Sequence, residues 1–172
     1  MSVQKKSTKA AAVNTKTLSS CALLTAAALI LSYIESLLPV FPGVPGIKVG
    51  FANIAVVFAL YRLGAQYALY VNIIRIAIAA LLFGSLFSGL YALAGGLFSL
   101  LVMVLLKKAG VFSITGVSMA GGAAHNLAQL AVAAMIVRTP QIVLYLPILL
   151  IAGTAAGIFN GIICNLVLQK LR

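Results

Sequence analysis

The chain has 172 residues, of which 63% are apolar and 8% are charged, and its formal net charge is +11. A mean hydropathy of +1.19 leaves too little polar surface for a soluble domain, so the composition predicts a membrane-embedded protein. The basic residues lie at the ends of apolar runs rather than along one face, which favours topology signals and contacts with anionic membrane lipid over a nucleic-acid partner.

Residues 1–17 contain several Lys, Ser, Thr and Ala residues and are predicted to form a basic cytoplasmic tail. Residues 18–172 are predicted to form a single transmembrane domain. A secretory signal peptide is the alternative for the N-terminus, because basic residues precede an apolar stretch that contains three alanines. The apolar run continues to Leu38, however, which favours a transmembrane helix that is retained.

Five apolar runs reach the roughly 20 residues that a membrane-spanning helix needs. These runs are Leu18–Leu38, Ala65–Phe83, Ser88–Leu106, Ile114–Val137 and Ile142–Leu168. A shorter run extends from Val49 to Tyr61, between Lys48 and Arg62, whose long side chains can reach the two membrane interfaces.

The distribution of basic residues decides whether the short run crosses the membrane. If it crosses, nine Lys and Arg residues lie on the cytoplasmic side and two lie outside; if it does not, five lie inside and six outside. Because cytoplasmic loops carry the excess of basic residues, we predict an all-α, multi-pass protein of the plasma membrane. It has six transmembrane helices and both termini in the cytoplasm.

Between the first two predicted helices, the segment from Pro39 to Gly46 contains three prolines and two glycines. This composition excludes a helix and predicts a turn-rich outer loop, which is either a gate over a binding site or a simple connector.

Glycines at spacing four in the last run, Gly153, Gly157 and Gly161, predict close helix packing. The pairs Gly95-Gly96 and Gly121-Gly122 are candidate points of local helix unwinding.

Polar residues inside the apolar runs are candidates for a functional site, because burying them in hydrocarbon is costly unless they are paired or face water. Arg75 is expected about 15 Å into the membrane and His125 about 17 Å, at similar depth. Asn72 lies one helical turn before Arg75. Gln129 lies one turn after His125, and Asn126 follows His125 directly. The candidate ligand-binding residues are Glu35, Lys48, Asn72, Arg75, His125, Asn126 and Gln129.

Two interpretations of these residues remain open. In the first, Glu35 neutralises Arg75 and the amides bridge the helices, so that the cluster is a structural polar core. In the second, Arg75 and His125 line a pocket that opens outward, with Glu35 and Lys48 near its mouth, and binds a ligand with an anionic group and an apolar body. Asn160 and Asn165 are predicted to form hydrogen bonds between helices.

Enzyme chemistry is not expected. The chain has one acidic residue and one histidine, which do not supply paired acid and base groups or a metal cluster, so no catalytic residue, metal or cofactor is predicted. It has no glycine-rich loop for ATP, so active transport would need an energy source outside the chain. Cys21 and Cys164 are predicted to be reduced packing residues.

Two stretches carry a resemblance to a known family: Gly46-Ile-Lys-Val-Gly-Phe-Ala-Asn-Ile54, which opens the second predicted helix, and Ala120-Gly-Gly-Ala-Ala-His-Asn-Leu-Ala-Gln129. With six short helices and a proline-rich first outer loop, the chain resembles the Gx transporter family, also called heptaprenyl diphosphate synthase component I. That family is similar to the substrate-binding S components of energy-coupling factor transporters. The resemblance extends from about Leu18 to the C-terminus.

The resemblance implies a six-helix binding subunit that captures a small, vitamin-like molecule outside and delivers it by tilting in the membrane. The implied partners are a transmembrane coupling subunit and two ATPase subunits, and Ala22 with Ala26 match the Ala-x-x-x-Ala surface that docks on the coupling subunit. The synthase name implies prenyl diphosphate chemistry, but the chain contains no Asp, so a non-catalytic accessory subunit is the alternative. A proton-driven transporter with Glu35 and His125 as proton carriers is a third possibility.

Overall fold

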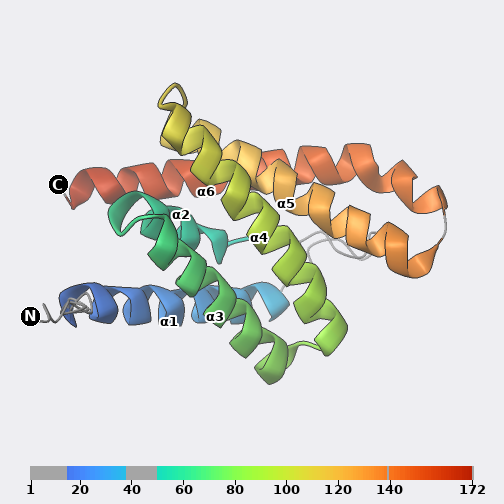
Figure 1. The fold of residues 1–172 in the computed structure, drawn as a ribbon, viewed down its shortest axis with the longest axis horizontal. Helices are drawn as coiled ribbons and strands as arrows, with labels where there is room; N and C mark the ends of the chain where they lie inside the picture. Colours follow the sequence, from blue (N-terminus) through green and yellow to red (C-terminus); the bar gives the residue numbers. More distant parts are fainter. Residues whose placement is uncertain (1–14, 38–49, 139, 172) are drawn as a thin grey trace, which may run out of the picture.

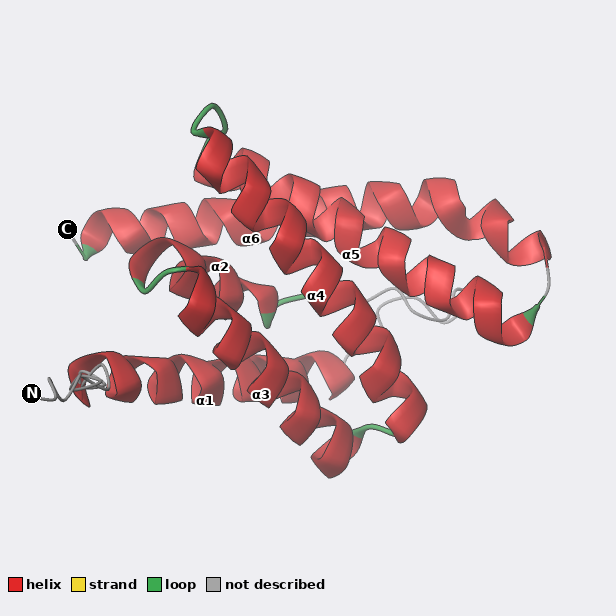
Figure 2. Cartoon of the chain, viewed as in Figure 1, coloured by secondary structure: helices red, strands yellow, loops and turns green. Residues whose placement is uncertain are grey.

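The computed structural model describes residues 15–37, 50–138 and 140–171. Within these ranges the chain forms six α-helices and one 3-10 helix, with no β-strand (Figure 2). The elements are α1 (Thr15–Leu37), α2 (Asn53–Arg62), α3 (Ala65–Phe83), α4 (Leu86–Ala109), α5 (Ile114–Val137), η1 (Pro140–Tyr145) and α6 (Leu146–Lys170). The predicted all-helical fold is therefore confirmed for the part of the chain that the structure describes.

The helix boundaries follow local capping. Helices α3 and α5 have the predicted bounds, whereas α4 begins two residues before the predicted Ser88. Its N-cap is Ser85, whose Oγ accepts a hydrogen bond from the backbone N–H of Ser88 at 3.1 Å, while Ser88 Oγ accepts one from the N–H of Ser85 at 2.8 Å. This reciprocal capping box satisfies two N–H groups at the start of the helix and so places the boundary ahead of the apolar run.

The starts of α1 and α6 also differ from the predicted ones. Helix α1 begins at Thr15 instead of Leu18, so the end of the predicted basic tail is helical. Helix α6 begins at Leu146 instead of Ile142, because the chain first forms the 3-10 helix η1. Pro147 lies in the first turn of α6, where a missing N–H costs nothing.

Helix α2 is short and starts later than predicted, at Asn53 instead of Val49. Gly50 adopts a left-handed backbone conformation with φ of 71°, so this residue itself cannot be part of a right-handed helix. With 10 residues, α2 is about 15 Å long, roughly half the thickness of the hydrocarbon core. At its far end, Lys107 Nζ of α4 donates a hydrogen bond to the carbonyl of Leu60 at 2.6 Å and lies 4.8 Å from the ring centre of Tyr61. The end of α2 is thus fixed beside the end of α4.

The hydrophobic core surrounds α2. Val56, Val57 and Leu60 of this helix are each about 1% exposed, and they form one cluster with side chains of α1, α3, α4, α5 and α6. Cys21 and Cys164 belong to the same cluster as free, buried thiols, as predicted. The short helix is therefore enclosed by the longer ones, which explains how α2 can be apolar on all sides.

The longer helices present apolar side chains outward. Five of them are long and apolar enough to cross a membrane, and exposed residues such as Leu23, Leu81 and Ile151 lie on their surfaces. Such surfaces are compatible with lipid and not with water. Figure 1 shows that α1 begins and α6 ends at the same end of the molecule. The chain is thus a multi-pass membrane protein, while its number of crossings and its orientation stay predictions.

Helices α5 and α6 form the most extensive interface, and glycines bring their backbones together. A Cβ added at Gly122 would lie 2.1 Å from the carbonyl oxygen of Gly153, and one at Gly157 would lie 2.5 Å from that of Ser118. The predicted packing role of the glycines in the last helix is confirmed. The predicted unwinding at Gly95-Gly96 and Gly121-Gly122 is wrong, since both pairs lie inside continuous helices.

Candidate ligand-binding cavity

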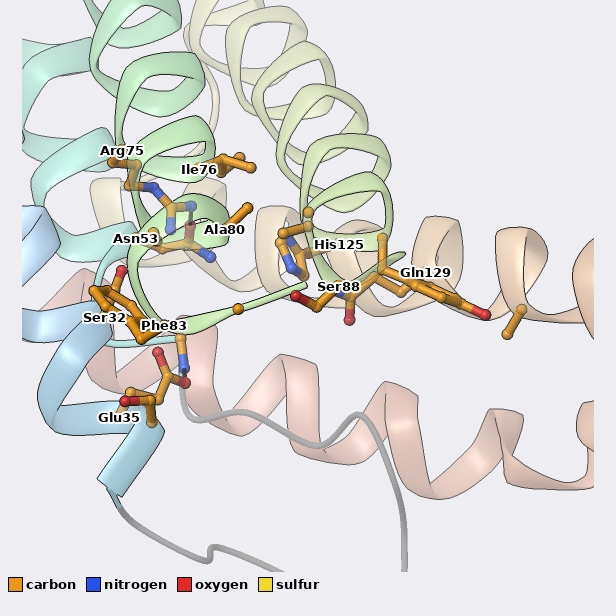
Figure 3. Close-up of a pocket in the computed structure, with 18 of the residues that line it drawn as sticks. Ser32, Glu35, Asn53, Arg75, Ile76, Ala80, Phe83, Ser88, His125 and Gln129 are labelled. Atoms are coloured by element: carbon orange, nitrogen blue, oxygen red, sulfur yellow. Dashed lines mark hydrogen bonds between the residues drawn. The ribbon is translucent and has the colours of Figure 1, made fainter. Parts of the chain in front are cut away.

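A cavity of about 590 Å³ lies where the ends of several helices converge, and residues of all six α-helices contribute to its wall (Figure 3). The volume falls in the range of pockets that bind drug-sized ligands. Part of the wall is apolar and aromatic, with Ile76, Phe83, Tyr91, Tyr145 and Leu149. The polar part includes Glu35, Asn53, Arg75, His125 and Gln129.

Arg75 is the central polar residue of this cavity. Its side chain is only 8% exposed, and its Nη2 donates hydrogen bonds to Asn53 Oδ1 at 2.9 Å and to Asn72 Oδ1 at 3.0 Å. Two amides from α2 and α3 therefore orient the guanidinium (Figure 3 shows Arg75 facing Asn53). They are neutral acceptors, so they orient the charge without neutralising it.

Two donors beside these bonds lack acceptors. Arg75 Nε and Asn72 Nδ2 are buried, and neither has a hydrogen-bond partner among the residues that the structure describes. Buried donors are nearly always paired in native proteins, because an unpaired one costs on the order of 1–3 kcal/mol. Asn72 does not line the cavity: its Nδ2 would lie 2.8 Å from a Cβ added at Gly96 of α4. Arg75 does line the cavity, so its guanidinium is the cationic group that the described wall offers to a ligand.

Glu35 holds the start of α2 in place. This residue lies in the last turn of α1 and is 9% exposed, and its Oε1 accepts a hydrogen bond from the backbone N–H of Gly50. The carbonyl of Gly50 in turn accepts a hydrogen bond from Asn160 Nδ2 of α6 at 2.9 Å. The turn before α2 is thus tied to α1 and to α6, and it carries Asn53 toward Arg75. Glu35 also interacts electrostatically with Arg75.

His125 and Gln129 lie on α5, one turn apart, and both line the cavity on a side separate from Arg75 (Figure 3). They lie close against α4 at Gly95, where an added Cβ would come within 2.9 Å of both His125 Cε1 and Gln129 Cγ. A larger residue at this position would displace these two side chains from their present places. Asn126 points elsewhere: its Nδ2 donates a hydrogen bond to the carbonyl of Leu149 at 2.7 Å and links α5 to α6.

The predicted site residues therefore divide into groups. Four line one cavity, namely Glu35, Arg75, His125 and Gln129. Asn72 orients Arg75, as its position one turn away suggested, whereas Asn126 forms a helix–helix contact. Lys48 and the predicted gate from Pro39 to Gly46 lie outside the described residues.

The sequence analysis missed Asn53, which contacts Arg75. A signal was present, since this amide lies at the beginning of an apolar run that is too short for an ordinary transmembrane helix. Tyr91, Tyr145 and Ser88 were missed as well. No spacing rule identifies these residues, because they line the cavity only through the way α4 and η1 are placed around it.

The two alanines predicted to dock a partner lie on the outer surface of α1. Ala22 and Ala26 are both exposed and one helical turn apart. Leu18 and Ile30, which are 57% and 61% exposed, extend the same line at spacing four. This face of α1 is thus exposed, whereas the buried residues of the helix include Cys21, Thr25 and Ala28.

Together, these features define a helical membrane protein with a ligand-sized internal cavity built around one buried arginine. In its described part, no group of three or more His, Cys, Asp or Glu residues could hold a metal ion. The family model for heptaprenyl diphosphate synthase component I matches residues 24–167. The chain belongs to this family, which confirms the resemblance seen in its sequence. No curated protein matches the chain.

Proposed function

We propose that this protein is the substrate-binding, S-component-like membrane subunit of a transporter of the energy-coupling factor type. It captures a small molecule with an anionic group and an apolar body from outside the cell. The observation that carries this proposal is the cavity of about 590 Å³ whose wall contains the buried Arg75. The protein itself is proposed to be non-catalytic.

The electrostatics of the cavity support an anionic ligand group. A guanidinium in a membrane-embedded interior is costly unless a counter-charge or strong acceptors surround it. The beginning of α2 adds to the positive potential, since Gly50 and Asn53 line the cavity and a helix N-terminus carries the positive end of the helix dipole. Ligand oxygens placed here would accept from the guanidinium of Arg75, which lines the cavity.

The proposed orientation places the cavity toward the outside. With six crossings and cytoplasmic termini, the end of α1, the end of α3 and the start of α6 all lie on the outer side. Residues at these ends, such as Ser36, Gly84 and Tyr145, line the cavity. Outer-side capture is therefore consistent with the helix order.

Energy for release would come from other subunits. We propose that the exposed line on α1 with Ala22 and Ala26 docks a transmembrane coupling subunit, which is associated with two ATPase subunits. Small side chains allow the close helix approach on which association within lipid depends. Copurification of the tagged protein with these three subunits tests this part.

The binding proposal is tested by uptake and by mass spectrometry of small molecules that copurify with the protein. The Arg75→Ala, His125→Ala double variant is expected to lose the copurifying ligand and to lose uptake, whereas Lys108→Gln, which removes one exposed charge at the end of α4, is expected to retain both. Gel filtration in detergent verifies that each variant is folded. Wild-type uptake by the folded double variant would refute the proposed site.

A second candidate is an accessory subunit in prenyl diphosphate metabolism, which the name of the matched family favours. The two functions predict different partners. An accessory subunit would copurify with a soluble prenyl-transferring enzyme, and its loss would lower prenyl diphosphate formation without any change in uptake. A transporter subunit would copurify with ATPases.

A further inference from the structure

We infer that the ligand of this cavity is a monoanion of the carboxylate class attached to an apolar body, and that the cavity discriminates against diphosphates. This inference rests on the proposed function, because it specifies the ligand of the same site. It departs from what the family name suggests, and three features of the cavity carry it: the balance of charges, the number of available donors and the nature of the walls.

The balance of charges disfavours a ligand with more than one negative charge. Of the described residues that line the cavity, Arg75 is the one Lys or Arg, and Glu35 places a carboxylate in the same wall. A monoanion leaves Arg75, Glu35 and the ligand with one net negative charge. A diphosphate would leave two or more, in a site where low polarisability strengthens like-charge repulsion.

The available donors also suit a small anionic group. Both hydrogen bonds of Arg75 to described residues are made by Nη2, and the same residue lines the cavity. One guanidinium matches the two oxygens of one carboxylate. Diphosphate sites in proteins instead combine several cationic side chains, a glycine-rich loop or a bound divalent metal with acidic ligands. The described wall has no cluster of acidic residues for such a metal.

The remaining wall suits an apolar or aromatic ligand body. Phe83, Tyr91 and Tyr145 come from three different elements and line the cavity together with small residues such as Ala80 and Gly89. Aromatic side chains provide large contact areas with little loss of conformational entropy. The ligand is therefore anchored by one charged end and enclosed by apolar contacts along the rest.

The test compares three probes that share one apolar body: geranic acid, geranyl diphosphate and geraniol. Binding is measured by isothermal titration calorimetry of the purified full-length protein in detergent, after any copurified ligand has been removed. For the wild type we expect geranic acid to bind on the order of tenfold more tightly than either other probe, the scale on which one unpaired charge acts in such a site. Arg75→Gln should abolish the preference for the acid over the alcohol.

Glu35→Gln provides the sharper control, because the amide keeps the oxygen that accepts from Gly50 and removes only the negative charge. This variant should narrow the difference between geranic acid and geranyl diphosphate, while Lys108→Gln should leave it unchanged. Equal or tighter binding of the diphosphate to the wild type would overturn the charge inference and leave the proposed binding subunit intact. Absence of binding by all three probes, with no copurifying small molecule, would overturn the proposed function and this inference with it.

Discussion

The contact between α5 and α6 at Gly122 gives the most quantitative prediction for this fold. In Gly122→Ala the new Cβ would lie 2.1 Å from the carbonyl oxygen of Gly153 and 3.2 Å from Gly157 Cα. Both obstacles are backbone atoms of a helix, which cannot rotate away as a side chain can. The two helices must therefore separate by more than about 1 Å before the contact becomes an ordinary one.

The expected cost follows from two opposing effects. Forcing extra volume into a packed contact costs about 1–3 kcal/mol, and the upper end applies because backbone opposes backbone. Replacing a helical glycine with alanine returns up to about 1 kcal/mol through helix propensity. The net loss is about 2 kcal/mol, which lowers the melting temperature of a chain of this size by about 4–8 °C. Thermal unfolding in detergent, followed by circular dichroism, measures this change in melting temperature.

Gly116→Ala is the matched control on the same helix. The nearest atom to its added Cβ is Ser113 Oγ at 3.5 Å, an ordinary contact, so this variant gains helix propensity without a clash. Its melting temperature should equal or exceed that of the wild type. If Gly122→Ala were as stable as Gly116→Ala, the close approach of α5 and α6 described above would be wrong.

Three further variants test individual side-chain contacts. Lys107→Gln should lower stability by about 1 kcal/mol, because its amide is too short to reach the carbonyl of Leu60, whereas Lys108→Gln should change little in the same thermal melts. Asn126→Leu should cost about 1–3 kcal/mol by leaving the carbonyl of Leu149 without its side-chain donor, with ligand affinity less affected than stability. Asn53→Leu should weaken ligand binding, measured by calorimetry, since Arg75 then loses one of the two amides that orient it; unchanged affinity would remove Asn53 from the site.

The hydrogen bonds to the backbone of Gly50 give Glu35 a structural role. The sequence showed only that Glu35 is the single acidic residue of the chain. Its carboxylate accepts from the backbone of Gly50, and Asn160 donates to the carbonyl of the same residue. The turn that starts α2 is therefore held from two helices. Because Asn53 follows this turn, Glu35 acts on Arg75 both electrostatically and by positioning the start of α2.

The interpretation of Arg75 changes accordingly. From the sequence, neutralisation of Arg75 by Glu35 and an outward-opening ligand pocket were alternative interpretations. In the structure both residues line one cavity, and the hydrogen bonds of the guanidinium go to Asn53 and Asn72. A structural polar core and a ligand site are thus compatible, because the amides hold the guanidinium by one nitrogen while Arg75 still lines the cavity.

Composition and hydropathy alone were enough to establish an all-helical membrane protein, since the free energy of burying apolar side chains in lipid depends on their number and run length. The bounds of α3 and α5, and the position of Arg75 inside an apolar run, could be read in the same way. So could the pairing of Asn72 with Arg75, because residues one helical turn apart share a face.

The cavity itself was decided by tertiary structure. Arg75 and Asn53 meet only because Gly50 turns the chain before α2, and His125 reaches the cavity only because Gly95 lets α5 approach α4. These contacts join residues far apart in sequence, and their geometry depends on backbone separations that side-chain patterns do not encode. Hydropathy identifies which residues must avoid lipid, but the packing of the helices determines which of them face one another.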